Sequence, residues 1–217
     1  MRFEPFMDPF PEHVPSEYWV RAAQDDWEHR QVAALRRAVF CEEQGLFGGA
    51  GSDDRDAVDA AAQPLAALAC VAGQPDQVVG TVRIHEACRV DGGAEPGVWW
   101  GSRLAVHRDF RGVSHLGAAL IRLAVGTAHG HGCHTFLAHV QAQNVPLFER
   151  LDWRLLKRLT LHGRPHGLMQ ADLAHYPPVA DAAQGFVLSL ARLQVARGAR
   201  VAQGAQAARG SALRRVA

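Results

Sequence analysis

The sequence predicts an α/β (α+β) fold in which a mixed, mostly antiparallel central sheet is flanked by helices. Three observations lead to this fold class. The 217 residues suffice for one domain with a substantial core. Apolar residues make up 48% and charged residues 21%, as in an ordinary globular protein. Patterns typical of helices and strands follow in the order helix, hairpin, strand, helix, strand, helix, strand, strand, which favours helices covering a sheet.

The bulk properties exclude several classes of protein. The net charge of +1 gives no reason to expect nucleic acid or an anionic membrane as the main partner. No apolar run approaches the roughly 20 residues that cross a bilayer, and the first residues contain acids and prolines instead of the apolar stretch of a secretory signal. The cysteines lie far apart, which favours reduced thiols in a cytoplasmic protein: Cys41, Cys70, Cys88 and Cys133.

The first half of the chain contains one helix and three strands in this interpretation. Four prolines in residues 1–15 predict an extended arm. Helical spacing of apolar residues predicts a helix over 25–43, and Asp25 and Asp26 suit its N-terminus. Two apolar runs, 65–71 and 78–85, flank the turn Gly73-Gln74-Pro75-Asp76 and predict a hairpin. A third strand is expected over 98–106.

The second half alternates helices and strands. We expect a helix from Leu116 to about residue 129, a strand over 136–140 and a short helix over 144–151. Strands at 154–161 and 168–173 surround a turn at 163–167. The pair Pro177-Pro178 follows a domain that spans 16–175. The remainder, 176–217, is an Ala/Arg-rich tail whose apolar stripe predicts that it is partly helical: Phe186, Leu188, Leu190 and Leu193.

The junction between the strand at 98–106 and the following helix has the chemistry of a phosphate site. A helix N-terminus carries unpaired amides and a partial positive charge, and glycines let an anion approach the backbone. Gly112 and Gly117 lie in this junction, and Arg108 and Arg111 add positive charge at its rim. The alternative is an ordinary surface loop with solvated arginines.

The same junction resembles the acyl-CoA-binding segment of the GNAT N-acetyltransferase superfamily. Members read V-x-P-x-[FY]-R-G-x-G-[IL]-G-x-x-L, and this chain reads V-H-R-D-F-R-G-V-S-H-L-G-A-A-L over 106–120. Ser114-His115 stands where one Gly is usual, so the loop is one residue longer. Other segments also match: R-A-V-F-C-E-E-Q-G at 37–45, an acidic cluster at 53–59, V-G-T-V-R at 79–83, the segment 140–153 around Asn144, and H-G-L-M at 166–169. The combination looks closest to the subgroup associated with nitrogen starvation.

The resemblance implies acetyl-CoA as the acyl-donor co-substrate and assigns residues to it. Pantetheine would lie along the strand at 104–106, the pyrophosphate against 111–118, and Asn144 and Phe148 beside the pantetheine arm. The implied cofactor-binding residues are Leu104, Ala105, Val106, Arg111, Gly112, Val113, Ser114, His115, Leu116, Gly117, Ala118, Asn144 and Phe148. No metal site is assigned.

The catalytic assignments follow from the same resemblance. Glu43 and Glu42 lie at the end of the first helix, which borders the acceptor site in the family, and are the leading candidates for the general base; the alternative is that both are solvated surface acids. Many members use a Tyr to protonate the departing thiolate, but Phe148 has no proton to give. His85 and His139 are further candidates for the base.

Other clusters carry alternatives. The aspartates of 53–59 either attract a cationic amine or form a solvated loop. His129, His131, Cys133 and His134 lack recognised metal-ligand spacing. Trp99 and Trp100 must point to opposite faces of their strand, so at most one of them lines a cleft.

The predicted function is therefore an N-acetyltransferase in which the amine of a small molecule attacks acetyl-CoA directly. One alternative is a non-catalytic acyl-CoA-binding sensor, and another is an acyltransferase of the same fold that uses an acyl carrier protein. The resemblance also allows a homodimer, and the expected location is the cytoplasm.

Overall fold

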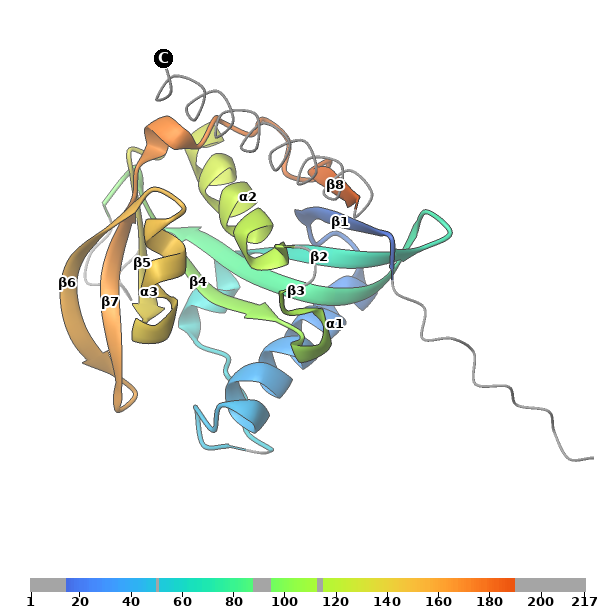
Figure 1. Ribbon diagram of the computed structural model, residues 1–217, viewed down its shortest axis with the longest axis horizontal. Helices are drawn as coiled ribbons and strands as arrows, with labels where there is room; N and C mark the ends of the chain where they lie inside the picture. The colour runs from blue at the N-terminus through green and yellow to red at the C-terminus, as the bar shows by residue number, and fades with distance from the viewer. Residues whose placement is uncertain (1–14, 50, 88–94, 113–114, 190–217) are drawn as a thin grey trace, which may run out of the picture.

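An eight-stranded sheet organises the computed structural model, which describes residues 15–49, 51–87, 95–112 and 115–189 (Figure 1). The strand order is β6-β7-β5-β4-β3-β2-β1-β8, and neighbouring strands are antiparallel except β4 and β5. The predicted fold class is confirmed. The strands are β1 Glu17–Ala22, β2 Gln63–Val71, β3 Gln74–Glu86, β4 Val98–Val106, β5 Thr135–Gln141, β6 Trp153–Leu161, β7 Arg164–Ala171 and β8 Phe186–Ser189.

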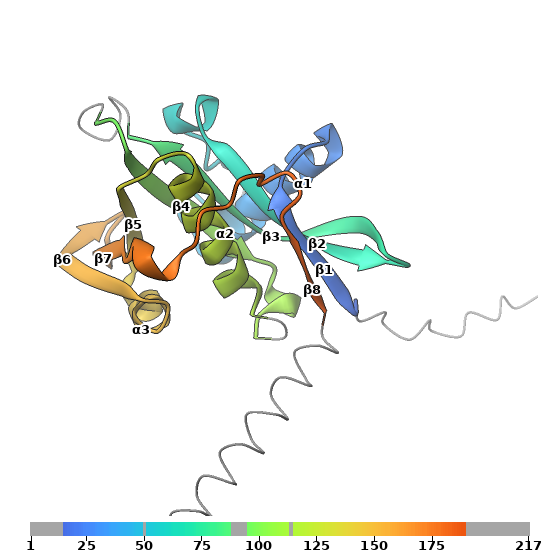
Figure 2. The same ribbon diagram turned by 90° about the horizontal axis from the view of Figure 1, so that it is seen from above.

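Helices cover both faces of this sheet, and they divide the core into two clusters (Figures 1 and 2). On one face, α2 buries Leu116, Leu120 and Leu123 and packs against β2, β3 and β4. On the other face, α1 packs Val32 and Leu35 against β2 and β3. The helices are α1 Asp26–Arg36, α2 Leu116–Gly130 and α3 Val145–Glu149. No helix in the described ranges is long and apolar enough to cross a membrane.

The first helix changes character at its end. Asp25 is the N-cap of α1 and forms a capping box with Glu28, in agreement with the helix start predicted at Asp25 and Asp26. From Arg37 to Glu43 the turns widen into a π-helix, η1, whose wider spacing buries three successive residues, Val39, Phe40 and Cys41. Such segments frequently occur at functional sites.

The sheet is wider than the sequence predicted. Glu17–Ala22 form β1, and the last described residues of the predicted helical tail form β8 instead, which pairs with β1 from Glu17↔Ser189 to Val20↔Phe186. The apolar residues Phe186 and Leu188 alternate with the exposed Val187, so their spacing of two residues belongs to a strand and not to the predicted helix. Residues 1–14 and 190–217 lie outside the described ranges, and so do Val113 and Ser114 of the expected cofactor loop.

Two features of β4 create the space for a site. It pairs with β5 only from Val98↔Thr135 to Gly101↔Ala138, although both strands continue beyond. On the β3 side, a bulge places two residues of β4, Arg103 and Leu104, opposite the single residue Val82 of β3. Arg103 takes a left-handed backbone conformation there, with φ of 54°. The second half of β4 is therefore open toward β5.

Candidate functional site

A cavity of about 470 Å³ lies at the opening between β4 and β5. Residues from both faces of the sheet line it. We call its part on the α1 face the chamber and its part on the α2 face the arm. The chamber is lined by η1 and the loop after it, by β3 and β4, and by β5, β6 and β7. The volume falls within the range of small-molecule sites.

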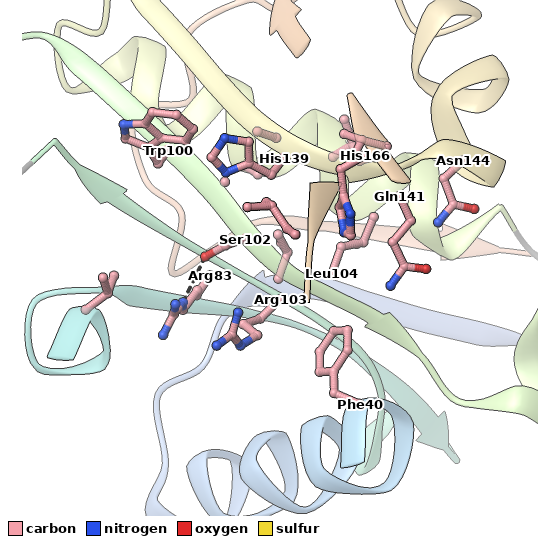
Figure 3. Close-up of a pocket in the computed structure, with 18 of the residues that line it drawn as sticks. Phe40, Arg83, Trp100, Ser102, Arg103, Leu104, His139, Gln141, Asn144 and His166 are labelled. Atoms are coloured by element: carbon pink, nitrogen blue, oxygen red, sulfur yellow. Dashed lines mark hydrogen bonds between the residues drawn. The ribbon is translucent and has the colours of Figure 1, made fainter. Parts of the chain in front are cut away.

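The floor of the chamber is polar and aromatic. Cross-strand pairing sets Arg83 opposite Ser102, and the Nε atom of Arg83 donates to Ser102 Oγ at 2.8 Å (Figure 3). Two residues further along the strand pair, on the same face, His85 lies opposite Trp100, and the His139 ring lies over Trp100 with ring centroids 5.0 Å apart. His139 directly follows Ala138, the last residue of β5 that pairs with β4.

A closed ring of six charged residues borders the chamber, and we call it the ion ring. Each arginine bridges two aspartates at 2.6–3.0 Å, so that positive and negative groups alternate around the ring. In order the members are Arg36, Asp54, Arg103, Asp56, Arg83 and Asp59. The ring ties α1, the loop after η1, β3 and β4 together. The acidic cluster at 53–59 is therefore a structural element, apart from the exposed Asp53.

The members of the ion ring have little bonding capacity left. Asp56 accepts hydrogen bonds from Arg83, Arg103 and the Val58 amide. Burial raises the pKa of Asp56, but the hydrogen bonds and charge of Arg83 lower it more, so the carboxylate stays ionised. Asp56 is the only acid among the described residues that line the cavity.

The residues of the arm belong to the main core of the protein. The walls of the arm come from α2, α3, β3, β5 and β6, and every one of its residues is at most 6% exposed. They are Val82, Ile121, Ala124, Phe136, Ala138, Val140, Phe148 and Trp153. Their one polar side-chain atom, Trp153 Nε1, donates to Tyr176 Oη at 2.9 Å outside the cavity. The arm is thus apolar and offers water no partner.

The predicted phosphate loop joins the open half of β4 to α2. Gly112 has φ of 78° and His115, the N-cap of α2, has φ of 54°, so the chain turns twice in the left-handed region before the helix begins. The Nε atom of Arg111 donates to the Val106 carbonyl at 2.9 Å, which holds the guanidinium beside the end of β4. The first amides of the 15-residue helix α2 follow immediately.

Glu43 contacts this loop instead of the chamber. Its carboxylate accepts two hydrogen bonds from Arg111, at 2.6 and 2.7 Å, and these bonds lower the pKa of Glu43. Glu42 is exposed, and neither acid lines the cavity. The next residue, Gln44, does line it: Gln141 on β5 donates to Gln44 Oε1 at 2.8 Å, and Arg164 donates to the Gln44 carbonyl. The end of η1 thus spans the opening of the sheet.

Comparison with known proteins decides the family. A sequence model described as the acetyltransferase (GNAT) family matches residues 6–153, which is more than half of the chain. The chain belongs to the GNAT family. GNAT proteins bind acyl-CoA and an acceptor, and this membership makes the chain an acyltransferase.

Solved structures agree with this membership at the level of the fold. A Lactobacillus plantarum protein described as an N-acetyltransferase is 20% identical with a TM-score of 0.59, covering 71% of this chain and 97% of that one. Escherichia coli ElaA is 19% identical with a TM-score of 0.56, and the match covers 71% of this chain and 98% of ElaA. An acyl-CoA N-acyltransferase from Pseudomonas aeruginosa is 18% identical with a TM-score of 0.55, and the match covers 71% of this chain and 99% of that protein. No curated protein sequence matches the chain significantly.

Several residues assigned through the GNAT resemblance lie together at the opening. Leu104, Asn144 and Phe148 line the cavity. Ala105 faces the core on the α1 side, so only its backbone is available to a ligand. Trp100 lines the chamber, whereas Trp99 packs on the opposite face and stacks on His131, as alternation along a strand requires.

The two tyrosines of this GNAT chain lie outside the cavity. Tyr18 lies on β1 with its side chain buried, and the Tyr176 hydroxyl is engaged by Trp153 and the Leu151 carbonyl. Burial raises the pKa of Tyr176 to about 12. Neither is placed to protonate a thiolate, and Phe148 packs edge-on to Trp153 with ring centroids 5.0 Å apart.

Sequence reasoning missed the arginines of the ion ring and the histidines from the β6–β7 hairpin, His162 and His166. One signal was available. Arg83 interrupts an apolar strand, and an acid-rich loop precedes that strand, which together indicate a buried ion pair. Among the described residues, no group of three or more His, Cys, Asp or Glu side chains is arranged to hold a metal ion.

Proposed function

We propose that this protein transfers an acyl group, acetyl in the simplest case, from acyl-CoA to the amine of a small molecule. The observation that carries the proposal is the cavity at the opening of the sheet, because it joins the open half of β4 to a polar chamber. The Arg111 loop and the α2 N-terminus lie at the end of that open half and suit a pyrophosphate.

The open half of β4 supports direct transfer without an acyl-enzyme. Backbone groups of β4 past Gly101 have no partner on β5, so they are available to pantetheine as an added strand. The bulge at Arg103 and Leu104 also removes regular pairing with β3, which favours a backbone amide there as the donor that polarises the thioester carbonyl. The amine nitrogen then attacks the carbonyl carbon, and the carbon–sulfur bond breaks.

The attacking ammonium must first lose a proton, and the departing thiolate must gain one. We assign the base to His139, because it lies on the chamber face where β5 leaves β4 and imidazole takes up protons near neutral pH. Glu43, the assignment made from the sequence, remains the competing candidate and is paired to Arg111. Proton return to sulfur needs no tyrosine if solvent or the same imidazole supplies it.

The charges of the chamber bear on the acceptor. A second ammonium on the acceptor would need a carboxylate, and Asp56 is already bonded to two arginines. Arg83, Arg103 and four histidines also line the cavity: His85, His139, His162 and His166. We therefore expect monoamines or amino acids to be better acceptors than polyamines.

Calorimetric titration with acetyl-CoA, followed by an amine panel read by released CoA thiol, tests this function. We expect binding in the micromolar to millimolar range, and an Arg111→Met substitution to weaken it about tenfold, since a hydrogen bond to a charged group contributes roughly 1.5–3 kcal/mol. Arg55→Met, at an exposed arginine that pairs with Asp53, is the control and should leave binding unchanged. No binding at millimolar acetyl-CoA would refute the proposal.

A further inference from the structure

Arg103 is the member of the ion ring that keeps a hydrogen-bond donor for the chamber. Arg36 and Arg83 use all three of their guanidinium nitrogens in hydrogen bonds. Arg103 uses only Nε and Nη2, which donate to Asp54 and Asp56. Within the described ranges its Nη1 atom makes no hydrogen bond, so two N–H groups remain for a ligand.

The position of Arg103 gives a ligand access to this donor. Arg103 lines the cavity, and 16% of its side chain is exposed, against 8% for Arg36 and 4% for Arg83. In the view of Figure 3 it stands between Arg83 and Phe40 at the edge of the chamber. Its Cζ atom lies 4.5 Å from the centroid of the Phe47 ring, and this contact orients the guanidinium before a ligand arrives.

The charge of Arg103 is less well compensated than the charges of its neighbours in the ring. Burial lowers the pKa of both Arg36 and Arg83, but hydrogen bonds to aspartates raise it by more. The pKa of Arg103 is instead lowered, by burial and by the positive charge of Arg83, in spite of Asp54 and Asp56. A negatively charged group beside Nη1 would therefore stabilise the charged guanidinium.

We propose that the acceptor is an amino acid whose carboxylate is bound by Nη1 of Arg103. This inference rests on the proposed function and decides between monoamines and amino acids as acceptors. A single nitrogen with two N–H groups suits a monoanionic carboxylate better than a dianionic phosphate. The apolar wall of the chamber suits an amino acid with an apolar side chain; this wall is formed by Phe40, Leu46, Phe47, Val58, Trp100 and Leu161.

A carboxylate bound in this way would direct the amine toward the opening of the sheet. Arg103 lies in the half of β4 that is open toward β5, and His139 lies where β5 leaves β4. An α-amino acid carries its amine and its carboxylate on one carbon, so a fixed carboxylate restricts where the amine can lie. The nitrogen–carbon bond forms as the carbon–sulfur bond breaks, the ammonium proton passes to the base, and the CoA thiolate takes up a proton. The products are an N-acyl amino acid and CoA.

Matched pairs of acceptors test the inference: phenylalanine against phenethylamine, and leucine against 3-methylbutylamine, where each amine lacks only the carboxylate. We expect kcat/KM with acetyl-CoA, read by released CoA thiol, to be at least about tenfold higher for the amino acid of each pair, since a hydrogen bond to a charged group usually contributes that much. Calorimetric titration of the CoA-bound full chain with the same pairs reads the same preference without turnover.

Two substitutions in the ion ring assign the preference to Arg103. Arg103→Gln should lower the ratio of kcat/KM between phenylalanine and phenethylamine by about tenfold. Arg36→Gln is the matched control and should preserve the ratio, because it also removes a guanidinium from the ring but Arg36 does not line the cavity. Both acceptors react on the same protein, so a lower folded fraction cancels in the ratio. If circular dichroism shows that a variant does not fold, the matched pairs on the unaltered protein decide alone.

The outcomes separate this inference from the proposed function. Equal kcat/KM and equal affinity within each pair, or a preference for the amines, would overturn the inference and leave acyl transfer in place. A ratio that is the same in folded Arg103→Gln as in the unaltered protein would overturn it as well. Failure to bind acetyl-CoA, with no CoA thiol released by any acceptor, would refute the proposed function. A calorimetric preference for the amino acids would in that case still support the carboxylate site.

Discussion

At the scale of single residues, the two candidate bases differ in their partners. His139 lies in the chamber on the Trp100 ring, whereas both oxygens of Glu43 accept from Arg111 outside it. Because those bonds lower the pKa of Glu43, its carboxylate is a weaker proton acceptor than an ordinary glutamate. Glu43 is better placed to orient Arg111 toward the phosphates of the donor than to deprotonate the acceptor.

Substitution of each residue distinguishes these roles. We expect His139→Gln to lower kcat by about 10²-fold or more, since general base catalysis is typically worth 10²–10⁴-fold. Glu43→Gln should change mainly KM for the acyl-CoA. His29→Gln, at an exposed position on α1, serves as the control. A large loss of kcat in Glu43→Gln with normal acyl-CoA affinity would return the base to Glu43.

At the scale of elements, the ion ring attaches the loop after η1 to the sheet. Asp54 is 2% exposed and receives the Nε atoms of both Arg36 and Arg103 at 2.9 Å. Its neutral replacement would leave those two guanidinium groups without their shared counter-charge. Removal of one partner from a buried ion pair typically costs about 3–5 kcal/mol.

The adjacent aspartates provide a matched pair for this effect. Asp54→Asn should lower the free energy of unfolding by about 3 kcal/mol, seen as a lower urea midpoint at unchanged m-value. Asp53→Asn should change it by less than about 0.5 kcal/mol, because the Asp53–Arg55 pair is exposed. Equal effects of the two substitutions would show that the ring does not hold the loop.

The hairpins show what the sequence could and could not specify at this scale. Both were predicted, but both turns were placed too late. The observed turns are Ala72-Gly73 and His162-Gly163, each with two positive φ values, as two-residue hairpins require. Pro75 and Pro165 suggested turns, yet each lies in the following strand near the tip, where only one neighbour pairs with it and no second amide is needed.

At the scale of the whole molecule, local patterns predicted the central elements and the family but not the long-range contacts. The strand β4 and the helix α2 matched their expected ranges because their apolar periodicity is strong. β8 was missed, because its four residues form a strand only through pairing with β1, more than 160 residues earlier. The cavity was invisible for the same reason, since its lining comes from elements spread from η1 to β7.

The ion ring also links the stability of the whole molecule to pH. Burial raises the pKa of Asp59, but hydrogen bonds from Arg36, the Asp56 amide and Arg83 lower it by more. The net result is a pKa well below the usual range of an aspartate. A carboxyl group whose pKa is lower in the folded than in the unfolded chain stabilises the fold above its unfolded value, near 3.9. That contribution is lost as the pH falls through the folded value.

Asp59→Asn tests this linkage. We expect the unaltered protein to lose stability steeply below about pH 4, because Asp56 and Asp59 both have lowered pKa values in the fold. The variant should be less stable at pH 7 but should lose less on acidification, so the difference between the two urea midpoints should shrink from pH 7 to pH 3. Comparison of the two proteins at each pH cancels the contribution of the histidines and other shared groups. A constant difference across this range would mean that Asp59 contributes through packing, and not through its charge.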